Sequence, residues 1–425
     1  MLRTYMIVGI IGSGGREHAI CHKIYHSKRI KKIYCFPGNG GTSQIAENVN
    51  IEVKEIGKLK KFITDKKINL VIVGPEQPLV NGVVDYLIKS NIKVFGPSKI
   101  ASQLEGSKIF TKNICKKYNI PTANFGVFNN KNDALDFIKK AKLPTVVKAD
   151  GLASGKGVYI CENYNDAENS INEIFNGKFG VAKNILIEEF LRGEEMSYFI
   201  ISDGKTFKKF QTAQDHKRVL EGDKGKNTGG MGAYSPSGII NEVLDKKIMD
   251  KIIIPTLKGL KEMGAIYKGF LYAGLMIIDN EPYLIEYNVR MGDPECQTIL
   301  PRLKTDIVKI FSSCCENKLE KVMIKWHEEK SLCIVLCSKG YPENFKNNLE
   351  INNLKKIKLE NNELIFHAGT INKNNIIYSN GGRVLNFVVL SKNFKISRIK
   401  AIQLIEKLDW QNGYYRKDIG FKVIK

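Results

Sequence analysis

The sequence predicts a multidomain protein in which an α/β part is followed by α+β parts, and three observations support this prediction. The chain has 425 residues, which is long enough for two to four domains, each with its own core. Apolar runs alternate with helical patterns over the first hundred residues, as in an open parallel sheet. After Trp326 the pattern changes to short strands separated by glycine turns, with a helix at residues 399–408. We therefore expect domains at 1–105, 106–326 and 327–425.

The composition is that of a soluble globular protein, with 43% hydrophobic and 26% charged residues. No run approaches the ~18 apolar residues of a membrane span. Residues 1–5 lead directly into the first strand, so we expect neither a signal peptide nor a membrane partner. The nine cysteines form no C-x-x-C pair, which is typical of reduced thiols rather than of a zinc site. We expect a cytoplasmic protein, and a monomer.

The net charge of +22 raises the question of a nucleic-acid partner. The excess consists mostly of lysine dispersed along the chain, mixed with isoleucine and asparagine, without a long basic block. Such a distribution favours a solvated surface, and we expect no nucleic-acid partner.

Four strands are predicted in the first domain, at residues 6–11, 33–36, 70–73 and 93–95, and a glycine turn follows each of them. In an open parallel sheet, ligands bind just beyond the carboxyl ends of the strands. The candidate binding residues in three of these turns are Gly15, Arg16, Glu17, Asn39, Gly40, Thr42, Gly74, Pro75 and Glu76.

These turns do not fit a dinucleotide-binding fold. Glu17 stands where G-x-G-x-x-G requires its third glycine, and the second strand does not end in the acidic residue that binds ribose. What remains is a glycine loop that opens a helix, whose free N–H groups can hold one phosphate. The turns therefore suit a phosphorylated sugar, and the alternative is that they are only tight turns.

A second glycine-rich segment lies between two predicted strands. Lys148 lies on the first strand, at residues 144–150, and Lys156 lies in the loop at 151–157. No helix follows the loop, so it is not a Walker A motif. Its N–H groups and lysines can close over a polyphosphate. The alternative is a glycine-rich hairpin with solvated lysines.

The next predicted strand, residues 185–191, ends close to the acidic residues Glu194 and Glu195. Such a strand can bind adenine through backbone groups and ribose through a carboxylate. Residues 214–218 then precede a glycine-rich stretch at 227–234, which is either a functional loop or disordered.

The stretch from Pro282 to Gly292 starts as a strand, on which alternate side chains share a face. One face is expected to carry the polar residues Glu286, Asn288 and Arg290. The opposite face is expected to carry Ile285, Tyr287 and Val289. A carboxylate and an amide oxygen suit Mg²⁺, and an arginine beside them can hold an anion. The alternative is an antiparallel strand with one solvated polar face.

In order and spacing, these motifs resemble the phosphoribosylamine–glycine ligase family of the ATP-grasp superfamily, which makes glycinamide ribonucleotide in purine biosynthesis. The resemblance covers nearly the whole chain. The matching stretches are residues 12–19, 37–42, 73–78, 104–108, 147–158, 187–195, 214–218, 227–236, 269–276, 285–295, 366–370, 380–385 and 415–420.

The resemblance implies a preATP-grasp parallel sheet, an ATP-grasp core with a mobile lid at about residues 122–192, and a small mixed C-terminal domain. It implies that ATP drives the ligation of glycine to 5-phospho-β-D-ribosylamine through glycyl phosphate, giving glycinamide ribonucleotide, ADP and phosphate. Other ATP-grasp carboxylate–amine ligases or carboxylases are the nearest alternative. A nucleotide-dependent nucleic-acid-binding protein is the alternative from another class.

The resemblance also implies roles for individual residues. Glu286 and Asn288 would hold Mg²⁺ or Mn²⁺ on the phosphates. ATP would contact Lys108, Lys148, Gly151, Ser154, Gly155, Lys156, Gly157, Glu188, Glu189, Leu191 and Glu195. Arg290 would stabilise the transferring phosphoryl group, Asp215 and Asp293 would orient glycine or the amine, and Gly292 would join the substrate-binding turns. No role is expected for His18, His216 or His367.

Overall fold

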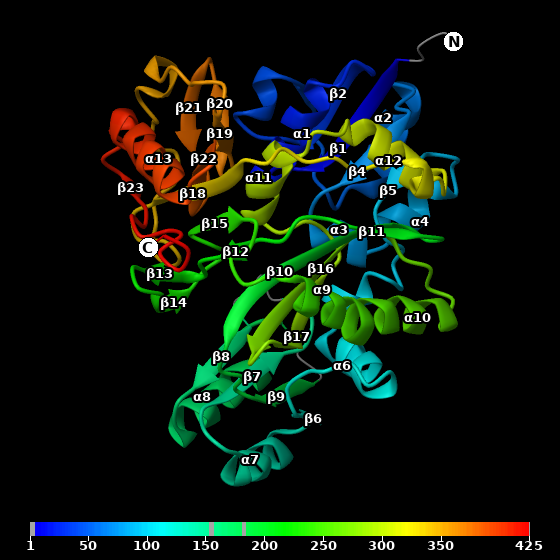
Figure 1. The fold of residues 1–425 in the computed structure, drawn as a ribbon, viewed down its shortest axis with the longest axis vertical. Coiled ribbons are helices and arrows are strands. Elements are labelled where there is room, and N and C mark those ends of the chain that lie inside the picture. The colour runs from blue at the N-terminus through cyan, green and yellow to red at the C-terminus, as the bar shows by residue number, and fades with distance from the viewer. Residues whose placement is uncertain (1–4, 153–156, 181–183, 425) are drawn as a thin grey trace.

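The computed structural model describes residues 5–152, 157–180 and 184–424 (Figure 1). The first part of the chain forms a parallel five-stranded sheet in the order β3-β2-β1-β4-β5. Its strands are β1 (Met6–Gly12), β2 (Ile30–Pro37), β3 (Glu47–Asn48), β4 (Leu70–Val73) and β5 (Val94–Phe95). Its helical segments are α1 (Gly15–Tyr25), η1 (Thr42–Gln44), α2 (Ile56–Asp65), α3 (Glu76–Val80) and α4 (Val83–Ile88). The four predicted strands are confirmed, and only the two-residue β3 was missed.

The strand order reverses between β1 and β4, because the chain adds β2 and β3 on one side of β1 before it crosses to the other. Such a reversal opens a crevice at the carboxyl ends of the two strands. The glycine turns after Gly12 and Val73 lie at this edge, which places the predicted substrate residues at the crevice.

The lid region at the bottom of Figure 1 is an antiparallel sheet in the order β6-β9-β7-β8. Its strands are β6 (Phe125–Phe128), β7 (Thr145–Ala149), β8 (Val158–Cys161) and β9 (Ile185–Glu189). The helices α7 (Lys131–Lys140) and α8 (Tyr164–Phe175) share a separate apolar core with it, which includes Ile138, Val147 and Ile171. The predicted arrangement of strand, glycine loop and strand is confirmed, because β7 and β8 pair on either side of the loop.

A second antiparallel sheet runs through the middle of the molecule in the order β11-β10-β16-β17. Its strands are β10 (Glu194–Asp203), β11 (Phe207–Lys209), β16 (Lys268–Ile278) and β17 (Glu281–Asn288). The helices of this part are α5 (Gln103–Gly106), α6 (Lys108–Lys117), α9 (Glu242–Ile248), η2 (Met249–Ile253) and α10 (Ile254–Glu262).

One expectation about β17 is wrong. The pairing with β16 shifts register between Gly274 and Leu275, which leaves Ile285 as the extra residue of a β-bulge. Leu284 and Tyr287 are buried, whereas Ile285 is only half-buried. The bulge therefore interrupts the alternation, and Ile285 does not share the buried face of Tyr287 and Val289.

The third sheet has the order β12-β15-β18-β22-β19, with β23 (Gly413–Tyr414) paired to β18. The strands are β12 (Gln214–Asp215), β15 (Gly232–Ser235), β18 (Lys330–Ser338), β19 (Glu363–His367) and β22 (Arg383–Ser391). Two hairpins lie beside it: β13 (Arg218–Leu220) with β14 (Lys224–Asn227), and β20 (Thr370–Lys373) with β21 (Ile376–Ser379). The remaining segments are α11 (Glu295–Ile299), η3 (Leu300–Arg302), α12 (Ile307–Cys315), η4 (Leu319–Lys321), η5 (Leu354–Lys356) and α13 (Phe394–Leu408).

This third sheet draws strands from both sides of residue 326, because β12 and β15 precede it and β18, β19 and β22 follow it. The predicted division into domains stays a prediction. Residues 227–234 are ordered: they end β14 and begin β15.

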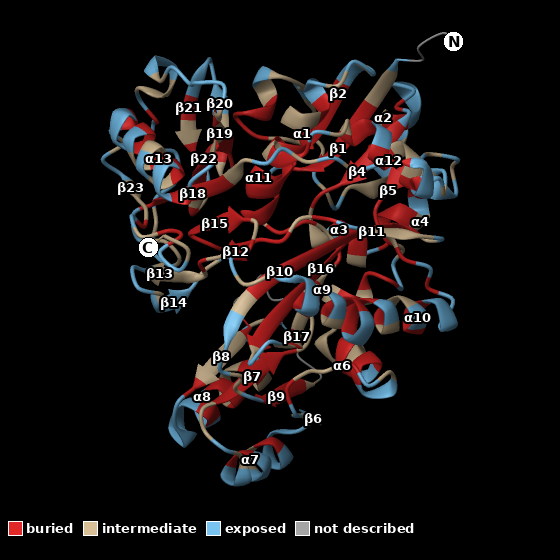
Figure 2. Cartoon of the chain, in the orientation of Figure 1, coloured by how far each residue is buried: buried red, intermediate tan, exposed pale blue. Residues whose placement is uncertain are grey.

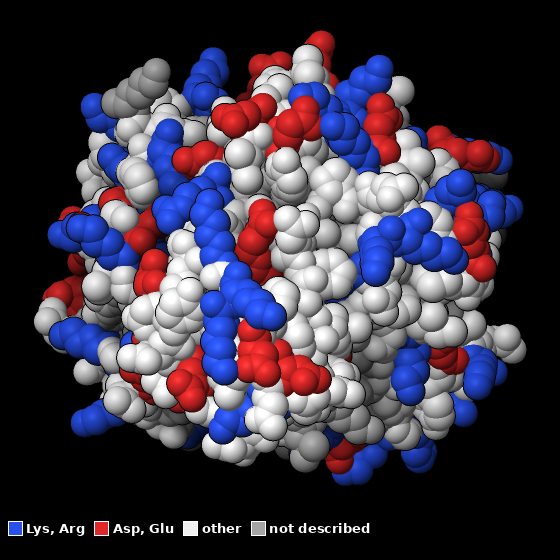
Figure 3. Space-filling view, turned by 90° about the horizontal axis from the view of Figure 1, so that it is seen from below, with Lys and Arg blue, Asp and Glu red and all other residues white. Residues whose placement is uncertain are grey.

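Buried residues fill the interior of the three larger sheets, and the outer faces of α7, α8, α10 and α13 are exposed (Figure 2). One apolar cluster joins β1, α1, α11, α12, β18 and β22, so the first and third sheets share a core. None of the described helices has the length and apolarity needed to cross a bilayer. On the face shown in Figure 3, basic and acidic side chains lie intermixed.

Candidate active site

The loop after β1 is closed by an internal ion pair. The guanidinium of Arg16 lies 2.7 Å from the Glu17 carboxylate, and the other carboxylate oxygen accepts a hydrogen bond from Gly14 N. Both side chains are buried. A Cβ on Gly74 would lie 2.0 Å from the Glu17 carboxylate, so only glycine fits there. Two of the predicted substrate turns are therefore in contact.

The third predicted turn is fixed by Asn39. Its amide Nδ2 donates to the carbonyls of Ser13, Gly14 and His367, and its Oδ1 accepts from the backbone N–H of Thr42. Gly40 N also donates to the carbonyl of Thr370, which begins β20. The structure therefore brings all three turns together with a loop of the C-terminal part, at residues 367–370. We call this group the substrate seat: residues 14–17, 39–42, 74–76 and 367–370.

Arg290 leaves β17 and enters the substrate seat. Its Nη2 lies 2.7 Å from Glu105 Oε1 and its Nε lies 3.3 Å from Glu76 Oε2. Glu105 also accepts from Val289 N. Burial raises the pKa of Glu105 to about 7, although Arg290 opposes the shift. Burial opposes ionisation of Glu76 too, but Arg290 and Arg16 hold its pKa below the ordinary value.

Asp293 ties three parts of the chain together. It accepts hydrogen bonds from Arg16 N and Gln297 Nε2, and Arg383 Nη1 lies 3.3 Å from its carboxylate. Burial opposes ionisation, but Arg383 and Arg16 keep the pKa of Asp293 below its ordinary value. Gly292 is buried, and a Cβ there would lie 2.2 Å from the Glu295 carboxylate. The structure thus places Arg290, Gly292 and Asp293 around the predicted substrate residues.

The lysines predicted to bind phosphate form a second group beside β7 and β9. Lys148 Nζ lies 2.5 Å and Lys112 Nζ lies 2.8 Å from the two oxygens of Glu188. All three side chains are at most 7% exposed. Although burial opposes it, Lys148 and Lys112 hold the pKa of Glu188 below its ordinary value. Glu188, which was expected to bind adenosine, therefore holds two lysines in this structure.

Lys108 connects this group with β17. Its Nζ donates to the carbonyl of Gly151 at 3.0 Å, at the start of the glycine loop. Burial lowers the pKa of Lys108, the Glu286 carboxylate on β17 raises it, and the Lys148 ammonium lowers it. Lys148 and Glu286 therefore both act on Lys108 from different sheets. The lysines that were predicted to contact ATP therefore lie near the strand that carries Glu286.

Glu286 and Asn288 are half-buried on β17, opposite Gly274 and Tyr272 of β16. Neither side chain makes a hydrogen bond or ion pair with another described residue. Their oxygens are thus available, and a carboxylate with an amide is a suitable but incomplete set for a hard cation. No group of three or more His, Cys, Asp or Glu in the described ranges is arranged to hold a metal. Further ligands would have to come from phosphate oxygens.

Asp215 lies in a cluster of charges at the end of β12. Burial raises its pKa to about 7; Lys217 opposes the shift, and Glu295 and Glu195 add to it. Lys217 Nζ lies 2.9 Å from Glu195, a predicted ATP-contacting residue. The charge of Lys217 is also stabilised by Glu286, so this cluster faces the predicted metal-binding strand.

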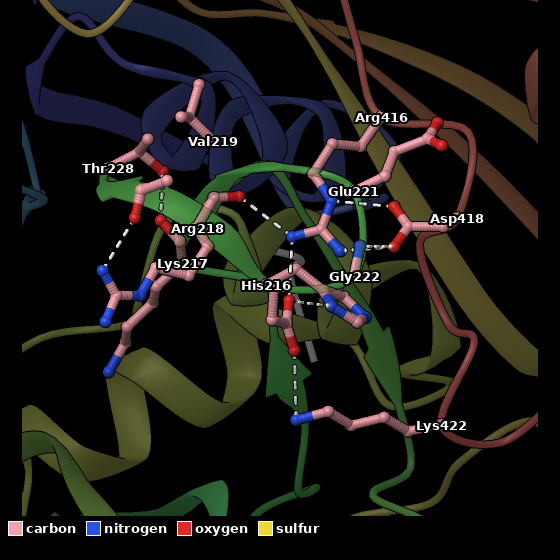
Figure 4. Close-up of polar contacts among 12 residues, drawn as sticks. His216, Lys217, Arg218, Val219, Glu221, Gly222, Thr228, Arg416, Asp418 and Lys422 are labelled. Atoms are coloured by element: carbon pink, nitrogen blue, oxygen red, sulfur yellow. Dashed lines mark hydrogen bonds and ion pairs between the residues drawn. The ribbon is translucent and has the colours of Figure 1, made fainter.

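The segment that carries Asp215 and Lys217 is held by the C-terminal tail (Figure 4). The fully buried Arg416 lies 2.8 Å from Asp223 and 2.7 Å from Asp418, and it donates to the carbonyl of Arg218. His216 Nδ1 lies 3.1 Å from Asp223, while its Nε2 accepts from Gly420 N at 3.0 Å. His216 and Arg416 therefore join the tail to the site-facing segment by structural hydrogen bonds.

Four predicted ATP-contacting residues have a partial description. Gly151 accepts from Lys108, and Gly157 is buried and accepts from Ala149 N. Glu189 is exposed and accepts from Asn124, and Leu191 is half-buried just beyond β9. Ser154, Gly155 and Lys156 lie outside the described residues.

Several residues of the site were missed by the sequence analysis. They are Glu105, Lys112, Asp150, Lys217, Arg383 and the pair His18 and His367. Lys217 and Arg383 fall inside stretches that the resemblance had marked, as does Glu105. His367 N donates to His18 Nδ1 at 2.8 Å, and this bond fixes the loop that holds Asn39. For Lys112 no local pattern exists that could have indicated its role.

The ATP-grasp class of proteins is defined by three such parts. They are a parallel sheet, a lid sheet with a glycine loop, and a central sheet that presents carboxylates to the lid. A solved structure of this class, the biotin carboxylase–beta-gamma-ATP complex from Campylobacter jejuni, has the same fold. Its TM-score is 0.72 at 15% sequence identity, over 95% of this chain and 92% of that chain.

Within this class, the chain belongs to the phosphoribosylglycinamide synthetase family. Its N domain description matches residues 6–105, its ATP-grasp (A) domain description residues 106–296 and its C domain description residues 331–422. The chain is 45% identical to the phosphoribosylamine–glycine ligase of Caldanaerobacter subterraneus, over 98% of this chain and 99% of the relative. The crystal structure of the Thermotoga maritima ligase has a TM-score of 0.84 at 34% identity, over 97% and 100% of the two chains. The family resemblance is confirmed.

Proposed function

We propose that the protein is an ADP-forming ligase that joins glycine to 5-phospho-β-D-ribosylamine and gives glycinamide ribonucleotide, ADP and phosphate. The observation that carries this proposal is the position of Arg290. It follows the strand of Glu286 and Asn288, and its guanidinium is bound by Glu76 and Glu105 at the substrate seat. One short stretch therefore serves both the phosphate-handling residues and the seat.

The chemical problem is that a carboxylate does not acylate an amine in water, because its oxide is a poor leaving group. Phosphorylation of the glycine carboxylate by ATP creates a leaving group, and the amine then attacks the glycyl phosphate. The first step requires charge neutralisation and in-line placement rather than a protein nucleophile. The residues found here are lysines, arginines and carboxylates, which supply these two requirements.

We assign the triphosphate to the region between Lys108, Lys148 and β17. Lys108 and Lys148 supply positive charge, and the glycine loop after Ala149 covers the phosphates. Glu286 and Asn288 fit Mg²⁺ or Mn²⁺, because neither side chain has a hydrogen-bond or ion-pair partner among the residues that the structure describes. When bound, the cation neutralises charge on the phosphates. Glu195 binds the adenosine together with backbone groups near Leu191.

We assign the phosphorylated ribose to the substrate seat. At the N-terminus of α1, the N–H groups of Gly14 and Arg16 are bound to the carboxylates of Glu17 and Asp293. The remaining N–H groups are assigned to the phosphate, and α1 is long enough to contribute its dipole. Asn39 fixes the second turn of the seat and Glu76 the third. Arg290 stabilises the charge that develops on the acyl phosphate. Asp215 and Asp293 orient the glycine ammonium and the incoming amine.

An ADP-release assay tests this function. We expect ADP only when glycine, freshly made ribosylamine and a divalent cation are all present. Other small amino acids should not replace glycine. Release of ADP that depends on bicarbonate instead would show a carboxylase of the same fold, and glycine-dependent release with another amine would show another ligase. We propose a monomer in the cytoplasm, which size-exclusion chromatography with light scattering and cell fractionation test.

A further inference from the structure

A large groove lies away from the active site, between α1 and the third sheet. Its volume is about 800 Å³, within the range of ~300–1000 Å³ that is usual for small-molecule sites. Its walls come from the outer side of α1, the turn after that helix, the segment joining η3 to α12, and the strands β19 and β22. Neither the substrate seat nor the phosphate lysines line it.

The groove carries an excess of positive charge. Four cations line it, together with one carboxylate, Asp306: the cations are Lys23, Lys28, Arg29 and Lys304. Asp306 is already occupied, because Oδ2 accepts from Ser27 and Oδ1 caps α12 through Val308 N. Of the cations, only Arg29 lies near it, at 3.7 Å. The three lysines form no ion pair with a described carboxylate.

Lys23 is the most informative of these lysines. It is half-buried on α1, and burial lowers its pKa, although the charge of Asp306 opposes the shift. The Lys23 ammonium has lost part of its hydration without gaining a carboxylate partner, which is unfavourable. An anion bound in the groove would supply that partner.

Two histidines, His22 and His26, lie beside Lys23 in the groove. The Nε2 atoms of His22 and His26 lie 3.2 Å apart, one helical turn from each other on α1. Burial, together with the nearby His26 and Lys23, lowers the pKa of His22 to about 4, so His22 is neutral at pH 7. Its ring can therefore donate or accept a hydrogen bond without adding charge.

The opposite wall is apolar. Leu364 of β19 and Leu390 of β22 are half-buried, and Phe366 packs its ring edge against His22 at a centroid distance of 5.6 Å. A ligand that is only an anion would leave this wall in contact with water. A ligand with an anionic end and a flat apolar end would satisfy both walls.

We propose that this groove is a second ligand site, which binds small phosphomonoesters that carry an aromatic or heterocyclic ring. The phosphate lies against Lys23 and Lys304, and the ring lies against Leu364 and Leu390. The groove shares no lining residue with the substrate seat. Its far end, at the C-cap residue His26 of α1, is ten residues beyond Arg16, which is roughly 15 Å along the helix axis.

Calorimetric titration of the full chain with phenyl phosphate tests the proposal, with inorganic phosphate and phenol as the two partial probes. We expect phenyl phosphate to bind at least about tenfold more tightly than either part, because only the whole molecule contacts both walls. The double variant Lys23→Ala/Lys304→Ala should weaken phenyl phosphate at least about tenfold.

The matched control is Lys61→Ala on α2, which removes an exposed lysine far from the groove. It should leave the titration unchanged. The double variant should keep the turnover and unfolding midpoint of the parent chain, because neither lysine has a carboxylate partner. Equal binding of phenyl phosphate and inorganic phosphate would overturn the proposal. Gly40→Ala crowds the substrate seat. If this variant lost phenyl phosphate binding while the double variant kept it in full, the ligand would occupy the seat, and this result would also overturn the proposal.

Discussion

The substrate seat differs from the proposed phosphate-binding region, which comprises Lys108, Lys148, Glu286 and Asn288, in how its polar side chains are bonded within the chain. In the seat, Arg16, Asn39 and Arg290 are bound to other residues of the chain before any ligand arrives. On β17, Glu286 and Asn288 have no such partners in the described part of the chain. The comparison suggests that the seat owes its shape to internal bonds, whereas the phosphate-binding region is completed by its ligands.

The largest effect is expected from a substitution at Glu286 on β17. Glu286→Ala should reduce turnover by about 10³-fold or more, because the charge opposite the phosphates is lost. The fold should not change, since Glu286 bonds to no described side chain. Steady-state kinetics and the thermal midpoint measure the two effects.

The matched control for this variant is Glu281→Ala on the same strand, which removes a surface partner of Lys247 and Lys251. It should keep full turnover. Wild-type activity in Glu286→Ala would refute the metal assignment and remove the contrast between the two regions.

The second prediction concerns the stability of the phosphate-binding region. Glu188, which lies beside Lys148, is bound to other residues of the chain, unlike Glu286 and Asn288. Glu188→Gln leaves Lys112 and Lys148 buried without their shared carboxylate, and should destabilise the lid by about 3 kcal/mol. Chemical unfolding followed by circular dichroism measures it. Asp136→Asn breaks an exposed pair with Lys139 on α7 and should leave the stability nearly unchanged, because solvent screens the pair. Equal effects in the two variants would contradict the role of burial.

The third prediction tests the seat. Arg290→Lys keeps a positive charge near Glu105 but loses the planar contacts to two carboxylates, so kcat should fall about 10²-fold with little change in ATP affinity. Kinetics and nucleotide titration separate these quantities. A loss of ATP affinity with unchanged kcat would place Arg290 in ground-state nucleotide binding.

The smallest effect is on pH dependence. Burial raises the pKa of Asp215 to about 7, so the carboxylate that we propose to orient glycine becomes protonated as the pH falls below 7. We expect kcat/KM for glycine to fall up to about tenfold per pH unit below 7. Asp215→Asn should lower the plateau and remove this slope. A slope that persists unchanged would assign it to another group, with Glu105 as the next candidate.

The same shift has a consequence for stability. A carboxyl group whose pKa is higher in the folded chain than in the unfolded chain favours folding in its protonated form. Its stabilising contribution is complete below the ordinary value of 3.8 and is lost as the pH rises through about 7. Asp215→Asn should therefore make the chain less sensitive to pH between 4 and 7.

Most of the fold followed from local patterns, because a strand that ends in a glycine turn leaves a signal within a few residues. The β1, β4 and β17 segments are of this kind. The bulge at Ile285 could not be predicted, since it depends on the register with β16 and reverses every side chain beyond it.

The site could be predicted only where its residues stand in a motif. Glu286, Asn288 and the glycine turns do. The pair Arg290 and Glu105 spans 185 positions, and the pair of Arg383 and Asp293 spans 90. Such partners are joined by packing of separate sheets, which no local pattern records. Lys112 was missed for the same reason, because it reads as an ordinary helix lysine.

The shared third sheet limits how this chain can be divided. A gene that stopped near codon 326 would leave β15, the strand on which the Asp215 strand pairs, without its neighbour β18, and would remove the tail that carries Arg416. We therefore expect that neither half folds without the other. Late truncations should be as damaging as early ones, and a fusion partner is tolerated at the chain ends rather than between them.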